Sequence, residues 1–182
     1  MSFNQVKARY LERLLVDARR GAVDSDILDW LFKVNDARCL ATTSSCSGRV
    51  AILYGDSLTD KAGSRILEVW HSPGECRRRI CGIVPDGMYT WWSSLQPPIV
   101  HFLADSLEAA EEVLKCGDRA GFSKLGYRLH RTGYYHVEAG GGDKLHIILP
   151  APCNILLSQC NMLQLYKERL EKFMECLLGV CR

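Results

Sequence analysis

The chain has 182 residues, of which 47% are hydrophobic and 24% are charged, and its formal net charge is +2. This balance is typical of a folded globular protein, and the length is too short for two full domains. No apolar run reaches the roughly 18 residues that a membrane helix needs, and the charged N-terminus lacks an apolar signal core. We therefore expect one cytoplasmic domain, spanning residues 1–182, with no membrane segment.

The periodicity of the apolar residues predicts the secondary structure along the chain. Apolar residues three or four apart indicate helices, and alternation or short β-branched runs indicate strands. In chain order we expect helices at 6–20 and 24–34, strands at 40–43, 50–54 and 65–71, a short helix at 74–81, strands at 88–92 and 99–103, a helix at 106–116, strands at 127–130, 133–138 and 144–149, and a helix at 155–178.

Capping residues and turns support this order. Asp24 or Ser25 is expected to cap the second helix, and Ser106 is expected to open the helix at 106–116. The Gly-rich segment 140–143 lacks the spacing of a dinucleotide loop and is expected to be a hairpin turn. Strands interspersed with helices, without a polar linker, predict an α/β fold of α+β character. We expect a single domain with a mixed or antiparallel sheet, flanking helices and no Rossmann motif.

Nine cysteines are many for a cytosolic chain, and none forms a C-x-x-C pair. Their spacing does not suit a zinc site, so we expect no metal. Buried free thiols are the first expectation. Intracellular disulfides of the kind found in hyperthermophiles are the alternative.

Basic, aromatic and imidazole side chains also stand out. Arg77–Arg79 form one basic cluster, and Lys124, Arg128 and Arg131 form another; each is either a solvated surface or part of a basic face. Tyr89 and Trp91 should share one face of a strand and Trp92 the other, so at most one tryptophan faces a given cleft. His71 and His101 are stronger functional candidates than His130, His136 and His146, although a strand histidine is more often a hydrogen-bonded core residue.

Residues 42–49 read TTSSCSGR, which places five hydroxyls, a thiol, a glycine and an arginine between apolar flanks. A sharp turn at residues 46–48 would present backbone N–H groups to an anion, and Arg49 can grip a carboxylate or phosphate with two bonds. The combination suits the carboxylate end of an amino-acid-like ligand. Cys46 would be a nucleophile if a histidine lowered its pKa. Composition alone favours an ordinary hairpin turn.

The same eight residues resemble the (Ser/Thr)-x-Ser-Ser-Cys-x-Gly-Arg signature of the wybutosine-synthesis methyltransferase family. Further segments are similar to family motifs over nearly the whole chain, namely 20–24, 69–71, 98–101, 120–122 and 166–176. The chain departs from the family pattern at Gln96-Pro97, after His101 and around Arg77.

The resemblance implies an S-adenosylmethionine-dependent enzyme that methylates a ring nitrogen, N4, of the 7-aminocarboxypropyl-demethylwyosine base beside the anticodon of tRNA-Phe. It implies a distinct α/β fold whose centre combines the signature with an aspartate and a histidine. The aspartate maps best to Asp24, with Asp17 second, and the histidine to His101, with His71 second. The implied catalytic residues are Asp24, His101, Ser45 and Cys46. The implied donor-binding residues are Thr42, Ser44, Ser45, Gly48, Arg49 and His71.

Methyl transfer from a sulfonium requires the donor and the acceptor nitrogen at near-attack distance, and a base that takes the proton of that nitrogen. We expect Asp24 or His101 to be the base and the other to orient it. Two rival hypotheses belong to other classes. One is a thiol hydrolase or amidase that uses Cys46 and His101, and the other is a non-catalytic RNA-binding module.

Overall fold

The computed structural model describes residues 2–58 and 62–180. Its helices are α1 (Phe3–Arg19), α2 (Leu28–Asp36), α3 (Pro73–Arg79), the 3₁₀ turn η1 (Ile80–Gly82), α4 (Leu107–Ala120) and α5 (Cys153–Leu177). Its strands are β1 (Leu40–Cys46), β2 (Arg49–Gly55), β3 (Arg65–Trp70), β4 (Thr90–Gln96), β5 (Ile99–Ala104), β6 (Lys124–Leu129), β7 (Tyr135–Gly140) and β8 (Leu145–Leu149). Within the described ranges, no helix combines the length and apolar character needed to cross a membrane.

The strands form two four-stranded sheets, ordered β1-β5-β7-β6 and β3-β2-β4-β8, in which the described neighbours are all antiparallel. The predicted α+β class, with an antiparallel sheet and flanking helices, is confirmed. The chain also divides into two compact units. The first contains the described residues up to Ser47, Pro98–Gly142 and those from Glu168 onward, and the second contains Gly48–Pro97 and Asp143–Lys167.

Two predicted hairpins are wrong. The segment between β1 and β2 is not a hairpin turn, because these two strands are not paired with each other. β1 pairs with β5, while β2 pairs with β3 and β4. The Gly-rich segment 140–143 likewise leads from β7, which pairs with β5 and β6, to β8, which pairs with β4. Local turn chemistry suggested hairpins, but the choice of strand partner is made by side chains far apart in the sequence.

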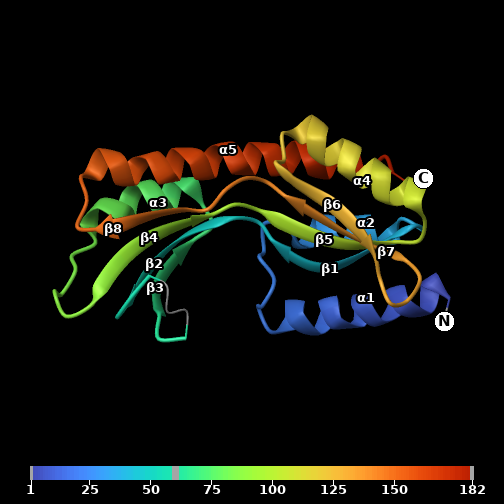
Figure 1. Ribbon diagram of the computed structural model, residues 1–182, viewed down its shortest axis with the longest axis horizontal. Coiled ribbons are helices and arrows are strands. Elements are labelled where there is room, and N and C mark those ends of the chain that lie inside the picture. Colours follow the sequence, from blue (N-terminus) through green and yellow to red (C-terminus); the bar gives the residue numbers. More distant parts are fainter. Residues whose placement is uncertain (1, 59–61, 181–182) are drawn as a thin grey trace. The chain divides into compact units, whose positions relative to one another are not determined.

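The first unit buries one face of its sheet under three helices. Val100, Phe102 and Val137 point from β5 and β7 into a core that α2, α4 and the end of α5 complete. The opposite face carries α1, which packs Val6 against Ala41 and Leu103, and Figure 1 shows α1 on the side of this sheet away from α4. Beyond α1 that face is polar, and it holds the site described below.

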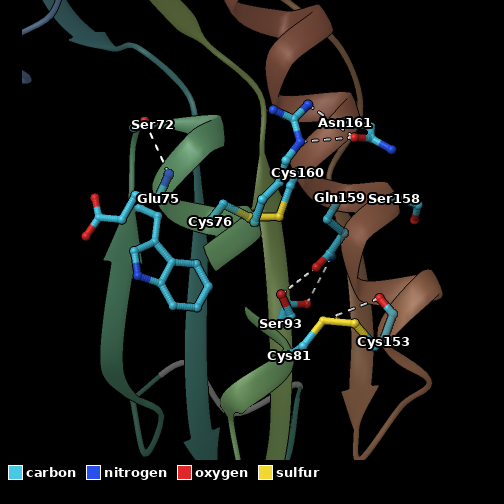
Figure 2. The surroundings of a disulfide bond; sticks show 12 residues. Ser72, Glu75, Cys76, Cys81, Ser93, Cys153, Ser158, Gln159, Cys160 and Asn161 are labelled. Carbon is cyan, nitrogen blue, oxygen red and sulfur yellow. Dashed lines mark hydrogen bonds between the residues drawn. A yellow bond between two sulfur atoms is a disulfide. The ribbon is translucent and has the colours of Figure 1, made fainter. Parts of the chain in front are cut away.

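The second unit packs α3 and the first part of α5 on its sheet, and two disulfides lie in that contact. Cys76–Cys160 and Cys81–Cys153 both join the α3–η1 region to α5, as Figure 2 shows. Gln159 of α5 is buried beside them and donates to the carbonyls of Ser93 and Leu145 at 3.4 and 3.0 Å. The core of this unit is apolar around those bonds.

Disulfides, rather than the expected free thiols, account for most of the described cysteines. A third bond, Cys116–Cys176, joins α4 to α5 in the first unit, and Cys39 is also disulfide-bonded. Cys46 keeps its thiol. The sequence could not predict the pairs, because their partners lie 60 to 84 residues apart.

Helix ends follow their capping residues, with one correction. Ser106 caps α4 by accepting from the Ala109 N–H, as predicted, and the C-cap residue Gly121 has a left-handed φ of 79°. The predicted cap of α2 is wrong, since α2 starts at Leu28 and its N-cap residue Ile27 makes no side-chain bond. The Asp24 carboxylate has another partner, described below.

We predict that reduction of the disulfides lowers the free energy of unfolding. Each bond closes a long loop and should contribute about 2–4 kcal/mol by restricting the unfolded chain. Urea denaturation of wild type with and without reductant measures the loss, and replacing Cys116 and Cys176 together by serine tests one bond alone. Coincident transitions under oxidising and reducing conditions would contradict the prediction.

Candidate functional site

A β-bulge in β1 decides which way the hydroxyl-rich stretch faces. Thr42 pairs with Phe102 of β5, but the register then shifts, so that Ser44 pairs with His101. Alternation in a regular strand would put Thr42 and Ser44 on the same face. The extra residue at position 43 breaks that alternation and re-aims the side chains that follow it.

Thr42 faces the side of the sheet that carries α2 and α4, and its side chain is hydrogen-bonded to Asn35. The Asn35 side chain donates to Thr42 Oγ1 at 2.6 Å and accepts from the Thr42 N–H at 3.0 Å. The Asn35 side chain also donates to the Leu31 carbonyl, one turn earlier in α2, and this bond fixes its orientation. Both Thr42 and Asn35 are buried, so the Thr42 hydroxyl already has a partner within the protein. Binding of the methyl donor by Thr42 remains a prediction.

Ser44 faces the polar side, where it meets His101. Ser44 Oγ lies 3.0 Å from His101 Nδ1, and they share a hydrogen bond whose direction depends on the imidazole tautomer. Glu138 of β7 pairs with His101 in register, and its carboxylate lies 3.7 Å from Nε2. Nε2 is buried and has no hydrogen-bond partner among the described residues. The row Ser44–His101–Glu138 therefore holds Nδ1 in a hydrogen bond and leaves the buried Nε2 without one from the described part of the chain, beside the Glu138 carboxylate.

A second imidazole lies beside this row. The ring of His136 is centred 5.2 Å from that of His101 and 6.5 Å from that of His130. Burial lowers the pKa of His136, and electrostatic interactions with His101, Arg128 and His130 lower it further, while Glu138 opposes them. His136 therefore adds a partly buried imidazole, with a lowered pKa, to the polar face.

Asp24 holds the end of the signature stretch in place. Its Oδ2 accepts a hydrogen bond from the backbone N–H of Ser47 at 2.7 Å, a charge-assisted contact. Ser47 is fully buried. This N–H is therefore engaged by the protein, contrary to the expectation that the N–H groups of residues 46–48 stand open to an anion. The conformation there does turn sharply, with a φ of 85° at Gly48.

A small hollow lies between α1 and the edge strand β1. Its volume is about 150 Å³, and it is lined by Tyr10, Arg13, Leu14, Asp17, Ala22, Val23, Thr42, Thr43, Ser44 and Ser45. Arg13 and Asp17 form an ion pair at 3.5 Å along α1. The hollow thus combines a cation, a carboxylate and hydroxyls, and Ser44 links it to His101.

The remaining predicted site residues are placed as follows. Ser45 and Cys46 belong to β1, opposite Val100 and Ile99 respectively. Gly48, Arg49 and His71 belong to the second unit. Arg49 donates from Nε to Gln96 Oε1 at 3.0 Å, and His71 lies just after β3. The structure thus joins Ser44 to His101 and Asp24 to Ser47, and it leaves the grouping of all these residues in one site a prediction.

The aromatic and basic candidates of the second unit differ in exposure. Trp91 and Trp92 are only 8% and 3% exposed, whereas Tyr89 is 44% exposed. Arg79 forms ion pairs with Glu68 and Glu75, and Arg77 bonds to Asn161. Of Tyr89, Trp91 and Trp92, Tyr89 is therefore the exposed aromatic residue, and its ring also contacts that of Tyr54.

Sequence reasoning missed Glu138 and Asn35 and gave His136 little weight. Glu138 and His136 are two residues apart on one strand, and this alternation is the only local sign that they share a face. No local signal connects Asn35 with Thr42 or Asp24 with Ser47, since each contact depends on how a helix or loop meets the sheet.

We predict that Asp24→Ala destabilises the fold by about 1–3 kcal/mol, because it leaves the buried Ser47 N–H without an acceptor. Asp24→Asn keeps an acceptor oxygen and should cost less. Urea denaturation of both variants measures the difference. Equal stability of wild type and Asp24→Ala would show that the hydrogen bond contributes nothing.

A pH dependence follows from His136, whose pKa in the fold lies below the ordinary 6.5. Above the ordinary value neither state binds this proton. As the pH falls through that value the unfolded chain is protonated first, so stability falls until the pH passes the folded pKa. Denaturation at pH 7.5 and pH 5 should show a smaller loss for His136→Gln than for wild type. An identical loss in both proteins would contradict this prediction.

Comparison with known proteins places the chain. Residues 5–177 match the family described as Methyltransferase TYW3. A Thermococcus sibiricus protein named tRNA(Phe) 7-((3-amino-3-carboxypropyl)-4-demethylwyosine(37)-N(4))-methyltransferase is 35% identical over 181 residues, which cover 94% of this chain and 92% of that protein. A Pyrococcus abyssi protein with this name and the suffix 2 is 32% identical over 155 residues, or 85% of this chain and 75% of that protein.

A solved structure, that of the PH1069 protein from Pyrococcus horikoshii, shares the fold. Its TM-score is 0.83 at 24% identity, with 96% of this chain and 95% of that chain covered. The family match spans nearly the whole sequence and includes the residues of the Ser44–His101 pair. This protein therefore belongs to the TYW3 methyltransferase family.

Proposed function

We propose that this protein uses S-adenosylmethionine to methylate N4 of the 7-aminocarboxypropyl-demethylwyosine base of tRNA-Phe. Relatives that share a quarter to a third of its residues over most of the chain carry names for this reaction. The observation that carries the proposal is the Ser44–His101 pair, because it presents a buried imidazole nitrogen beside the signature hydroxyls. We further propose that residues 1–182 act as one catalytic domain in the cytoplasm, where tRNA is found.

The hollow beside β1 fits the amino-acid end of the donor. Its hydroxyls, the Arg13 guanidinium and the Asp17 carboxylate complement a group that carries both a carboxylate and an ammonium. Its volume of about 150 Å³ lies below the roughly 300–1,000 Å³ of a pocket for a whole ligand. We therefore assign only that end of the donor to Ser44, Ser45 and α1. The bound donor supplies an electrophilic methyl group on a sulfonium.

His101 is the preferred proton acceptor. When Nδ1–H donates to Ser44 Oγ, the lone pair lies on the unpartnered Nε2, where it can take the proton of the acceptor nitrogen. The Glu138 carboxylate, 3.7 Å away, then faces the imidazolium and stabilises its charge. Such general-base assistance contributes roughly 10²–10⁴ in rate.

Asp24 is better suited to orient the site than to accept the proton. Its carboxylate is committed to the Ser47 N–H, and this bond holds the chain immediately after Cys46. Gly48, Arg49 and His71 remain proposed contacts of the donor or of a phosphate. Tyr89 is the proposed stacking platform for the target base, because an exposed ring can stack on a splayed base.

The hydrolase hypothesis makes a different demand of the same residues. It needs the Cys46 thiolate beside His101, whereas the residue directly across from His101 is Ser44 and the residue across from Cys46 is Ile99. Cys46→Ser should abolish a hydrolase, and it should leave measurable methyl transfer. A non-catalytic RNA-binding module would bind tRNA without binding S-adenosylmethionine.

Two measurements test the proposal. Calorimetry with S-adenosylmethionine, in the presence and absence of tRNA, should show saturable binding. The purified protein should then methylate tRNA extracted from a strain blocked at this step, with the product identified by mass spectrometry. No heat at saturating donor with tRNA present would overturn the assignment.

We predict that His101→Ala lowers the rate of methyl transfer by roughly 10²–10⁴. Donor affinity should change little, because the hollow that we assign to the donor is lined by other residues. Single-turnover kinetics and calorimetry separate the two effects, and a thermal melt checks the fold. A variant that methylates at the wild-type rate would show that His101 is not the base.

A further inference from the structure

A second and larger hollow lies in the polar face of the first unit's sheet, over β6 and β7. Its volume is about 490 Å³, and it is lined by Lys124, Leu125, Gly126, Tyr127, Arg128, His136 and Glu138. Two of these residues neighbour the proposed base. The Glu138 carboxylate is 3.7 Å from His101 Nε2, and the ring of His136 is centred 5.2 Å from that of His101.

The strand register explains why the hollow exists. Arg128 pairs with His136, and Gly126 with Glu138, so these four positions form two cross-strand pairs on the face that also carries His101. Gly126 lies between the cations of β6, Lys124 and Arg128. A Cβ built on Gly126 would meet nothing within 4 Å. Because glycine has no side chain, this position leaves open space at the floor of the hollow, which is the part formed by β6.

The charges around this space favour an anion. Lys124 and Arg128 lie on one strand, and Arg128 is exposed and forms no ion pair within the described residues. Burial lowers the pKa of His136 most, and Arg128 is one of the neighbours that lower it further. The lining contains one acid, Glu138, whose carboxylate faces His101. By contrast, Arg79 in the other basic cluster is neutralised by Glu68 and Glu75.

The three imidazoles do not make a metal site, since no suitable group of three or more His, Cys, Asp or Glu side chains occurs among the residues described. A phosphate suits the hollow better. A guanidinium can bind two phosphate oxygens at once, and an ammonium adds a point charge.

We propose that this hollow binds a backbone phosphate of the substrate RNA, at or next to the nucleotide whose base reaches His101. This inference rests on the proposed function, which supplies a tRNA substrate and a modified base at His101. Phosphate contacts set the register of an RNA on a protein, and contacts to the base provide specificity. A phosphate held by Arg128 on β6, which is separated from the His101 strand β5 by β7 alone, would set how far the target base enters the site.

The test is the affinity of wild type and variants for tRNA-Phe from the blocked strain, titrated by fluorescence anisotropy over a range of salt concentrations. Arg128→Gln should weaken binding roughly tenfold at low salt. It should also reduce the slope of log K against log salt by about 0.7–1, since one counterion-releasing contact is lost. Arg119→Gln is the matched control, because Arg119 is exposed on α4, which packs on the opposite face of the sheet.

Two variants of Gly126 that carry opposite charges provide a second test. Gly126→Glu and Gly126→Lys add side chains of comparable length into open space, so both should fold, which thermal melts verify. Gly126→Glu should bind tRNA at least tenfold more weakly than Gly126→Lys. Equal affinities for the two variants would mean that the hollow has no electrostatic role and would overturn the proposal.

Two further outcomes separate the possible failures. If inorganic phosphate binds wild type in calorimetry while Arg128→Gln binds tRNA with unchanged affinity and slope, the hollow takes free anions only and the inference is wrong. If Arg128 controls tRNA binding but wild type transfers no methyl group, the proposed function fails and the RNA site stands. Donor affinity, measured separately, should be equal in wild type and Arg128→Gln.

Discussion

The one-residue bulge in β1 is the constraint on which the candidate site depends. Without it, Thr42 and Ser44 would face the same side of the sheet, and the row of Ser44, His101 and Glu138 could not form. With it, one hydroxyl enters the interface with α2 and the other reaches the polar face. Because side chains alternate along a strand, a single inserted residue redirects all that follow. The bulge leaves Thr43 without a partner on β5, and it places Ser44 where it can hydrogen-bond to His101 Nδ1.

Three residues of the signature stretch have tertiary partners. Asn35 holds Thr42, His101 meets Ser44, and Asp24 accepts from Ser47. Buried polar groups are costly unless they are hydrogen-bonded, so the partners of Thr42 and Ser47 explain how these two residues can be buried. The same bonds orient the side chains in advance, and a methyl transfer that depends on positioning benefits from that order.

Charge on the polar face is organised around the imidazoles. Burial lowers the pKa of His136 and its neighbours lower it further, while the Glu138 carboxylate lies 3.7 Å from His101 Nε2. The rings of His101 and His136 are centred 5.2 Å apart, so both imidazoles share this part of the polar face. Disulfides between helices support each unit, so the sheet that carries these groups has a rigid backing.

The sequence by itself determined the fold class, most helices and strands, the Ser106 cap of α4 and, through TTSSCSGR, the family. These features depend on local periodicity, local hydrogen bonds and a short motif, all of which can be read within a few residues. Only the tertiary structure decided the sheet partners of β1 and β2, the disulfide pairs, the hydrogen bond between Asp24 and Ser47, and the presence of Glu138 beside His101. Each of these joins residues that are far apart in the chain, and their meeting depends on packing, on strand register and on one bulge that no local pattern of residues predicts.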